Sequence, residues 1–297
     1  MTIAERTKRI NAADLVAVDV HVHAMTVEKK QDGSTFGQSA SKYFGADMAD
    51  KGSEVLGAYY RERKMAAVIF SVDEYLSGAP FLGNDKVVEI AAASPDVLIP
   101  FASINPHRGK EGVEEAKRLV AGGAICGFKF HPPLQEFFAN DSMAYPLYEV
   151  IAESGLPALF HTGHSGIGTR VRGGGGVRQK YGNPIYLDDI AVDFPDMPMI
   201  MAHPSFPWQD EAISVCLHKP QVYIDLSGWS PKYFSPLLIQ YANTLLKDKM
   251  LFGSDFPVIT PDRWLKDFDS IGIKDEVRPL ILKDNAVRLF GLKNQTT

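Results

Sequence analysis

The sequence contains little cysteine and no long apolar segment. Its 297 residues include two cysteines, Cys126 and Cys216, which are far apart and form no C-x-x-C pair. A disulfide framework and a thiolate zinc site are therefore not expected, and this composition fits a reducing compartment. No apolar stretch approaches the roughly 18–20 residues that span a bilayer, and no apolar segment follows the charged N-terminus. We expect a cytoplasmic protein without a membrane partner.

An excess of positive charge is also missing. The formal net charge is −5, so a nucleic-acid partner is not expected. No internal repeat or low-complexity linker interrupts the chain, and we expect a single domain over residues 1–297. A homo-oligomer is compatible with these features, although the sequence identifies no interface.

What the sequence does contain is a regular series of short apolar runs. Each is apolar almost throughout, as expected of parallel strands that are buried on both faces. The eight runs span residues 15–23, 64–72, 97–104, 124–131, 157–163, 197–204, 222–228 and 250–257. Helical patterns separate them, and these cover residues 84–93, 112–121, 145–154, 211–218, 235–246 and 275–292. Such alternation predicts an α/β fold, a single (β/α)8 TIM barrel, with a doubly wound open sheet as the alternative.

Polar residues stand near the C-terminal ends of these predicted strands. They are His21, His23, Asp73, Lys129, His131, His161, His203, Asp225, Ser227 and Asp255. In a barrel these ends form one rim, where catalytic residues are found. His21 and His23 alternate onto one face, and imidazole together with carboxylate suits zinc or a neighbouring first-row metal. Each residue alone could be an ordinary strand end, and only a closed barrel brings Asp255 beside the first strand.

Four motifs carry a resemblance to a known family. HVH at 21–23, LFHTGH at 159–164, MAHPSFPW at 201–208 and FGSDFP at 252–257 resemble the metal-dependent amidohydrolase superfamily. The last two resemble the amidohydrolase-2 branch, which contains aminocarboxymuconate-semialdehyde and resorcylate decarboxylases. GFKFHP, HTGH, HPSFPWQDEA and DLSGWSPKYF are further similar to hydroxyphenyl-β-ketoacyl-CoA hydrolases.

The resemblance implies a metal site and a set of roles. His21, His23 and His161 would bind one divalent ion, which we expect to be Zn²⁺, with Mn²⁺ also compatible. Asp255 would be both a ligand and a proton acceptor, and His203 would be the acid/base residue. A divalent ion lowers the pKa of bound water to roughly 7 and polarises a carbonyl group.

Lys129 leaves two arrangements open. Some amidohydrolases hold two metal ions bridged by a carboxylated lysine on the fourth strand, with His161 and His203 on the second ion. In the other arrangement, which we expect, there is one metal ion and Lys129 is a free ammonium group that faces the substrate. His131 precedes two prolines; it is a candidate for substrate contact, for support of a ligand, or for a plain strand end.

Loops after the predicted strands supply candidate substrate contacts. Residues 165–184 contain four consecutive glycines and four cations, of which Arg170 and Arg172 could contact the phosphates of coenzyme A. The alternative is a solvated loop without a ligand. Trp208 and Trp229 lie at loop positions on the same rim, where an aryl or acyl group could pack; ordinary packing is the alternative. His164 also lies near this rim, as a candidate for substrate contact or for support of a metal ligand.

The function expected from the sequence is hydrolytic cleavage of a carbon–carbon bond. The predicted substrate is an aryl β-ketoacyl-CoA, and the reaction is of the retro-Claisen type. A non-oxidative decarboxylase of an aromatic or enoic acid is the first alternative. A lactone, ester or amide hydrolase is the second, and a catalytically silent barrel that serves as a binding subunit is the third.

Overall fold

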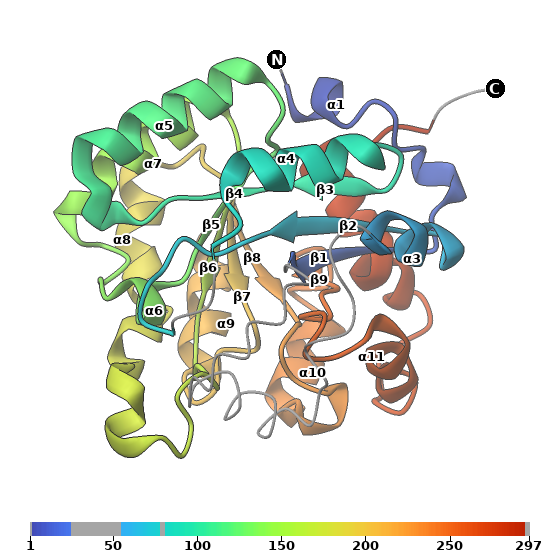
Figure 1. The fold of residues 1–297 in the computed structure, drawn as a ribbon. Coiled ribbons are helices and arrows are strands. Elements are labelled where there is room, and N and C mark those ends of the chain that lie inside the picture. The colour runs from blue at the N-terminus through green and yellow to red at the C-terminus, as the bar shows by residue number, and fades with distance from the viewer. Residues whose placement is uncertain (1, 25–54, 78–80, 295–297) are drawn as a thin grey trace.

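The strands of the protein form a closed parallel barrel in a computed structural model that describes residues 2–24, 55–77 and 81–294. Figure 1 shows the strands at the centre and the helices around them. The strands are β1 (Ala17–His23), β2 (Met65–Phe70), β3 (Leu98–Pro100), β4 (Ala102–Ser103), β5 (Phe128–Phe130), β6 (Ala158–His161), β7 (Met199–Ala202), β8 (Val222–Asp225) and β9 (Met250–Leu251). All eight predicted strands are present, and the third is divided at Phe101 into β3 and β4.

Backbone contacts at two places close the barrel. At Phe101 the third strand changes neighbours: its backbone N–H donates to the Ile69 carbonyl of β2, and Ala102 then pairs with Phe128 of β5. On the other side, Val22 of β1 bridges to Phe256, which follows β9. Because β1 and the last strand meet directly, the fold is the predicted (β/α)8 barrel and not an open sheet.

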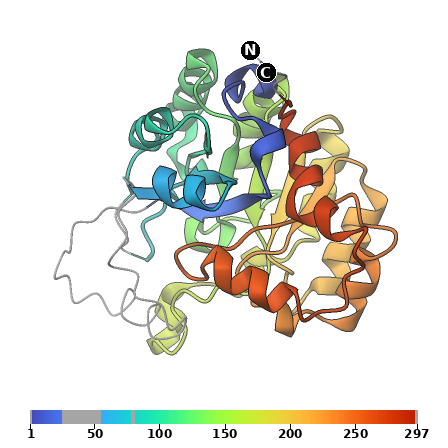
Figure 2. The ribbon, with the colours of Figure 1, turned by 90° about the vertical axis from the view of Figure 1, so that its right-hand side faces the viewer.

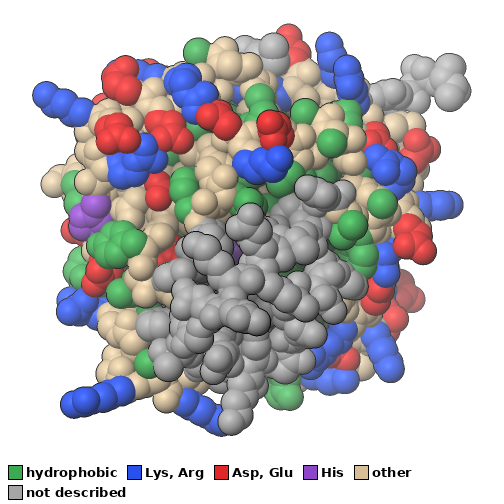
Figure 3. Space-filling view, in the orientation of Figure 1, with side chains coloured by type: hydrophobic (Ala, Val, Ile, Leu, Met, Phe, Trp, Pro, Cys, Tyr) green, Lys and Arg blue, Asp and Glu red, His purple; other side chains and the backbone are tan. Residues whose placement is uncertain are grey.

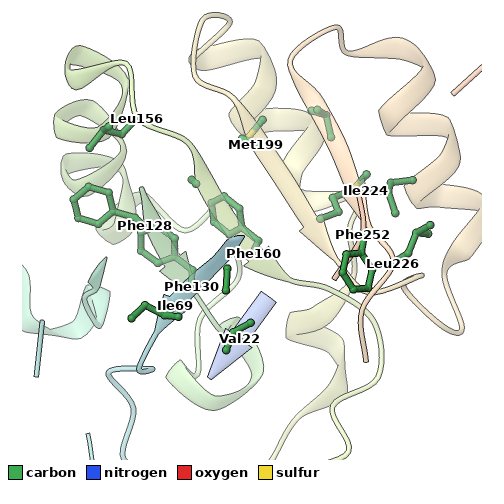
Figure 4. Close-up of a cluster of buried hydrophobic side chains, with 14 of the residues drawn as sticks. Val22, Ile69, Phe128, Phe130, Leu156, Phe160, Met199, Ile224, Leu226 and Phe252 are labelled. Carbon is green, nitrogen blue, oxygen red and sulfur yellow. The ribbon is translucent and has the colours of Figure 1, made fainter. Parts of the chain in front are cut away.

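The side chains of the strands alternate between the barrel interior and the helix layer. Phe128 and Phe130 of β5 point outward with Phe160 of β6 and pack against the helices (Figure 4). Leu159 and Ile200 belong to a separate cluster inside the barrel. Lys129 lies between the two outward phenylalanines, so its side chain points inward, as the sequence pattern predicted.

The helices surround the barrel and follow the strands in order. They are α1 (Ile3–Arg6), α3 (Leu56–Glu62), α4 (Asn84–Ala93), α5 (Gly109–Gly122), α6 (Pro132–Gln135), α7 (Tyr145–Ser154), α8 (Tyr186–Asp193), α9 (Gln209–His218), α10 (Pro236–Ala242), α11 (Pro261–Phe268) and α12 (Asn285–Phe290). Two helices match their predicted bounds at both ends, and α7 ends at Gly155 in the left-handed conformation (φ 66°). The last helix is shorter than predicted, because a π turn at Leu280–Asp284 precedes α12.

Both ends of the described chain lie at the same end of the barrel (Figures 1 and 2). The backbone of Asn11 bridges to Lys293 there. Cationic and anionic side chains are mixed over the face seen in Figure 3, in agreement with the small net charge. Within the described ranges, each helix is too short or too polar to cross a bilayer.

Candidate active site

The polar side chains near the C-terminal ends of the strands meet on one side of the barrel interior. The register of β1 against β2 shifts between Asp19 and Val22, which is a local irregularity of the bulge type. As a result Val20 packs in the interior cluster while Val22 packs outside. The irregularity changes which positions face inward and so places both His21 and His23 at the site.

Three side chains form a candidate metal-binding cluster. Oδ1 of Asp255 lies 3.1 Å from Nε2 of His23 and 3.3 Å from Nε2 of His21. In the described part of the chain, one ligand atom from each of the three lies within 4.8 Å of the others. The backbone N–H of Asp255 also donates to the His21 carbonyl over 3.0 Å, so the closure of the barrel sets the spacing of this cluster.

The state of His21 suits a metal ligand. Its Nδ1 lies 2.7 Å from the Asp225 carboxylate, which leaves Nε2 toward His23 and Asp255. Burial lowers the pKa of His21 well below its usual value, so the ring is neutral and Nε2 can carry a lone pair. A carboxylate on the second ring nitrogen is the usual support for a metal-binding histidine. These residues therefore fit a divalent ion of the zinc or manganese type.

His161 and His203 form a second group beside this cluster. Nε2 of His203 lies 3.0 Å from Nδ1 of His161, and the His203 ring centre is 4.9 Å from that of His21. Burial lowers the pKa of His203 to about 4. Among the described residues, Nε2 of His161 is buried without a hydrogen-bond partner. That nitrogen is free to accept a ligand or a proton.

Two residues of the site have strained backbones. His203 has φ +76° and Asp255 has φ +69°, a region that side chains other than glycine rarely adopt. Such strain is frequently found where a side chain must be aimed for function. His203 directly follows β7 and Asp255 lies four residues after β9, so both strained residues stand at the C-terminal ends of strands.

Lys129 and His131 are both buried among the histidines of the site and are not exposed at the outer rim. Lys129 is fully buried, and its Nζ lies 3.4 Å from Nε2 of His21. Burial lowers the pKa of Lys129. The His131 ring stacks on that of His161, with centroids 3.9 Å apart, and within the described ranges its Nδ1 has no hydrogen-bond partner.

The predicted loop contacts are more peripheral. Arg170 and Arg172 are exposed on the loop after β6, while Trp208, Trp229 and His164 are half-buried. The Trp229 ring lies 5.5 Å from Phe206, whose carbonyl accepts a hydrogen bond from the backbone of His164. Two other cations of the β6 loop contact the segment after β5: Arg178 pairs with Glu136, and Lys180 lies over the Phe138 ring.

Three contributors were missed or left without a role by sequence reasoning. The Phe70 ring packs edge-on against His21 and His23, at 5.1 and 4.9 Å between centroids. Ser227 contacts both His21 and His203. Phe206 forms the aromatic pair with Trp229. Phe70 is the last residue of β2, and Ser227 lies two residues after β8. Their position near a strand end was the signal available in the sequence.

The comparisons with known proteins agree with this architecture. A TIM-barrel protein from Bordetella bronchiseptica superposes with a TM-score of 0.74 at 23% identity, over 93% of this chain and 98% of that one. A dihydroxybenzoic acid decarboxylase from Polaromonas, solved with manganese and 2-nitroresorcinol, gives a TM-score of 0.65 at 16% identity, over 95% and 98%. A probable 2-pyrone-4,6-dicarboxylic acid hydrolase from Acinetobacter baumannii, solved with citric acid, gives 0.60 at 17%, over 94% and 100%.

Sequence comparison extends this likeness from fold to family. No curated protein matches the chain. The family model described as amidohydrolase matches residues 18–292, a span that begins within β1 and ends just after α12. It therefore includes the two histidines of β1, the aspartate after β9 and every strand end between them, and the chain belongs to the amidohydrolase-2 family.

Proposed function

We propose that this protein is a divalent-metal-dependent hydrolase that cleaves a carbon–carbon bond beside a ketone. The substrate class would be an aryl β-ketoacyl thioester, and the products an aryl carboxylic acid and a shortened acyl thioester. The observation that carries the proposal is the convergence of His21, His23 and Asp255 beside the neutral, buried His203. Water supplies the oxygen of the new carboxylate and the proton of the new methyl group, so the reaction is balanced.

The ion would be held by His21, His23 and Asp255, with His161 completing the set. When bound, a divalent ion acts as a Lewis acid that acidifies water and polarises a carbonyl group. We expect zinc, and manganese is the alternative. Metal analysis of protein purified without chelators, followed by reconstitution with each ion, distinguishes the two.

The side chains around the ion would each stabilise charge or transfer a proton. Asp255, whose Oδ1 faces two imidazoles, would accept a proton from the attacking water. The buried Lys129 would stabilise negative charge on a substrate oxygen. His203 would take up a proton at Nε2 during the reaction and deliver it to the departing carbon. Each of these three side chains lies next to His21.

Substrate recognition would use the loops around the mouth. Trp229 and Phe206 offer apolar aromatic surface to an aryl group, and Trp208 lies on the same loop as Phe206. Arg170 and Arg172 are exposed cations that could meet the phosphates of coenzyme A. His131 and His164 would contact polar atoms of the substrate.

A defined substrate and isotopic water test the reaction. The metal-loaded enzyme is incubated with 4-hydroxyphenyl-β-ketopropionyl-CoA in ¹⁸O-labelled water, and products are separated by mass spectrometry. We expect acetyl-CoA and 4-hydroxybenzoate that carries one labelled oxygen. Absence of turnover at full metal occupancy would contradict the proposal.

A non-oxidative decarboxylase is the second candidate function. The observation that favours it is the fold shared with a manganese-containing dihydroxybenzoic acid decarboxylase. Decarboxylation needs a proton for the carbon that loses carbon dioxide, and His203 could supply it. Release of carbon dioxide from 2,6-dihydroxybenzoate, with no ¹⁸O in the aromatic product, would support this candidate. Hydrolysis of a lactone such as 2-pyrone-4,6-dicarboxylate tests the hydrolytic alternative suggested by the third structural relative.

A further inference from the structure

Ser227 lies at a junction that the proposed roles do not use. Its hydroxyl oxygen is 2.8 Å from Oδ2 of Asp225, 3.0 Å from Nδ1 of His203 and 3.1 Å from Nδ1 of His21. All four side chains are buried, so water does not compete for these positions. Each nitrogen must therefore be matched by a protein donor or acceptor.

The donors at this junction can be counted. In its ionised form the Asp225 carboxylate only accepts, and two groups of Ser227 donate to it: the hydroxyl to Oδ2 and the backbone N–H to Oδ1 over 2.9 Å. Nδ1 of His21, 2.7 Å from the same Oδ2, must then carry a proton. Asp225 in this way fixes the proton of His21 on Nδ1.

The same count decides the state of His203. A serine hydroxyl has one proton, and here that proton is directed to Asp225. Toward His203 the Ser227 oxygen can only accept, so Nδ1 of His203 must be the donor. Nε2 of His203 is then left with a lone pair, and this is the atom that faces His161.

Two glycines leave room for this arrangement. A Cβ at Gly228, which has φ +72°, would lie 2.3 Å from Nδ1 of His203. A Cβ at Gly253 would lie 2.1 Å from Oδ1 of Asp225 and 2.9 Å from Cβ of Ser227. The backbone on both sides therefore approaches the junction so closely that no side chain fits there.

We propose that Ser227 is a positioning residue that, oriented by Asp225, holds His203 as the Nδ1-protonated tautomer, with a lone pair on Nε2, the atom that faces His161. The Asp225 carboxylate thereby fixes the tautomers of two imidazoles. It acts on His21 directly and on His203 through the Ser227 hydroxyl. The consequence for catalysis rests on the proposed function, because it requires His203 to exchange a proton at Nε2. The tautomer itself does not depend on any activity.

The tautomer is measured directly in metal-free protein. Long-range ¹H–¹⁵N spectra of histidine-labelled protein at pH 8 distinguish protonated from bare ring nitrogens, and the variant His203→Gln identifies the His203 signals. We expect the proton of His203 on Nδ1 in the wild-type protein. In Ser227→Ala we expect a shift toward the Nε2-protonated form. A wild-type proton on Nε2, or an unchanged tautomer in Ser227→Ala, would overturn the proposal.

Kinetics and metal content then test the consequence. Loss of a supporting group of this kind typically costs about 10- to 100-fold in activity or affinity. For Ser227→Ala we expect that loss in kcat, little change in KM and unchanged metal content. Ser230→Ala is the matched control, because Ser230 lies on the same segment and its hydroxyl donates to the buried Asp267 instead. Equal losses in both variants would contradict a specific role.

The two proposals fail in distinguishable ways. If the wild-type protein turns over none of the tested substrates, the proposed function fails while the tautomer measurement remains valid. If turnover is found but the tautomer is wrong, only the positioning role fails. Ser227→Thr keeps a hydroxyl, and we expect it to restore both the Nδ1 proton and the kcat lost in Ser227→Ala.

Discussion

Nζ of Lys129 lies 3.4 Å from Nε2 of His21, although 108 residues separate them in the sequence. The lysine is fully buried and its Nζ is 4.9 Å from the centre of the Phe70 ring. It therefore lies beside the cluster that would hold the ion. This position is compatible both with a free amine or ammonium beside one ion and with a carboxylated lysine that bridges two.

Replacement of Lys129 by methionine separates these two arrangements. Methionine keeps most of the volume but cannot be carboxylated or carry charge. For the one-metal arrangement we expect one metal equivalent in both the wild type and Lys129→Met, with kcat reduced by about 100-fold or more, as for loss of an electrostatic group aimed at developing charge. Metal analysis and kinetics measure these quantities. Two equivalents in the wild type that fall to one or none in the variant would establish the bridged arrangement.

The proposed ligands can be tested without knowledge of the substrate. His23→Ala removes one ligand atom of the cluster, and Asp255→Asn removes its negative charge. Each variant should lower the metal content and the gain in Tm on metal addition. His218→Ala is the matched control, since His218 is exposed on α9. Elemental analysis and thermal unfolding, with and without chelator, provide the readout. Unchanged metal binding in His23→Ala would exclude this residue as a ligand.

The strand pattern was sufficient to predict much of the fold. Near-continuous apolar runs with polar ends can be recognised locally, and a closed ring follows from their number and order. The division of the third strand at Phe101 was not predicted, because it depends on which neighbours that strand meets on each side. The same holds for the irregularity in β1, which depends on its pairing with β2.

The candidate site was predicted in part for the same reason. His21, His23 and Asp255 come together because strand ends converge, which sequence order alone implies. Asp225 and Ser227 were visible as a polar strand end, but their roles depend on distances between imidazole and hydroxyl atoms. No spacing rule supplies such distances.

Asp19 anchors the strand that carries the two histidines. Its carboxylate accepts four hydrogen bonds: from the backbone N–H groups of His21 and Ser254, from the Ser254 hydroxyl and from the Tyr60 phenol. In an asparagine at this position the NH₂ group would face N–H or O–H donors and could not accept their hydrogen bonds. Each buried polar group left unpaired costs about 1–3 kcal/mol. We expect Asp19→Asn to lower the free energy of unfolding by about 2–4 kcal/mol on the same basis.

Tyr60→Phe provides the graded comparison for this network. It removes one of the four donors and leaves no donor unpaired, so we expect a loss of about 1 kcal/mol. Both values are obtained from denaturant unfolding monitored by circular dichroism. An Asp19→Asn variant as stable as the wild type would show that the network does not stabilise β1.

The two cysteines should be inert in the folded protein. Burial raises the pKa of both Cys126 and Cys216 to about 12 from an ordinary value of 9.0. The thiolate is the reactive form, so neither side chain should react with Ellman's reagent at pH 8 unless the protein unfolds. We expect no labelling of native protein and two labelled thiols per chain in guanidinium chloride. Rapid labelling of the native protein would contradict the buried placement.

The same raised pKa values predict a loss of stability in alkali. Between pH 9 and 12 the native protein retains thiol protons that the unfolded chain releases, so the unfolded state binds fewer protons. The free energy of unfolding should therefore fall as the pH rises through this range, and the full contribution should be present below pH 9. We expect replacement of both cysteines by alanine to lower Tm at pH 8, because packing is lost. The further fall in Tm between pH 8 and 10.5 should be smaller in this variant than in the wild type. An equal fall in both proteins would show that other groups, such as the buried tyrosines, determine the alkaline behaviour.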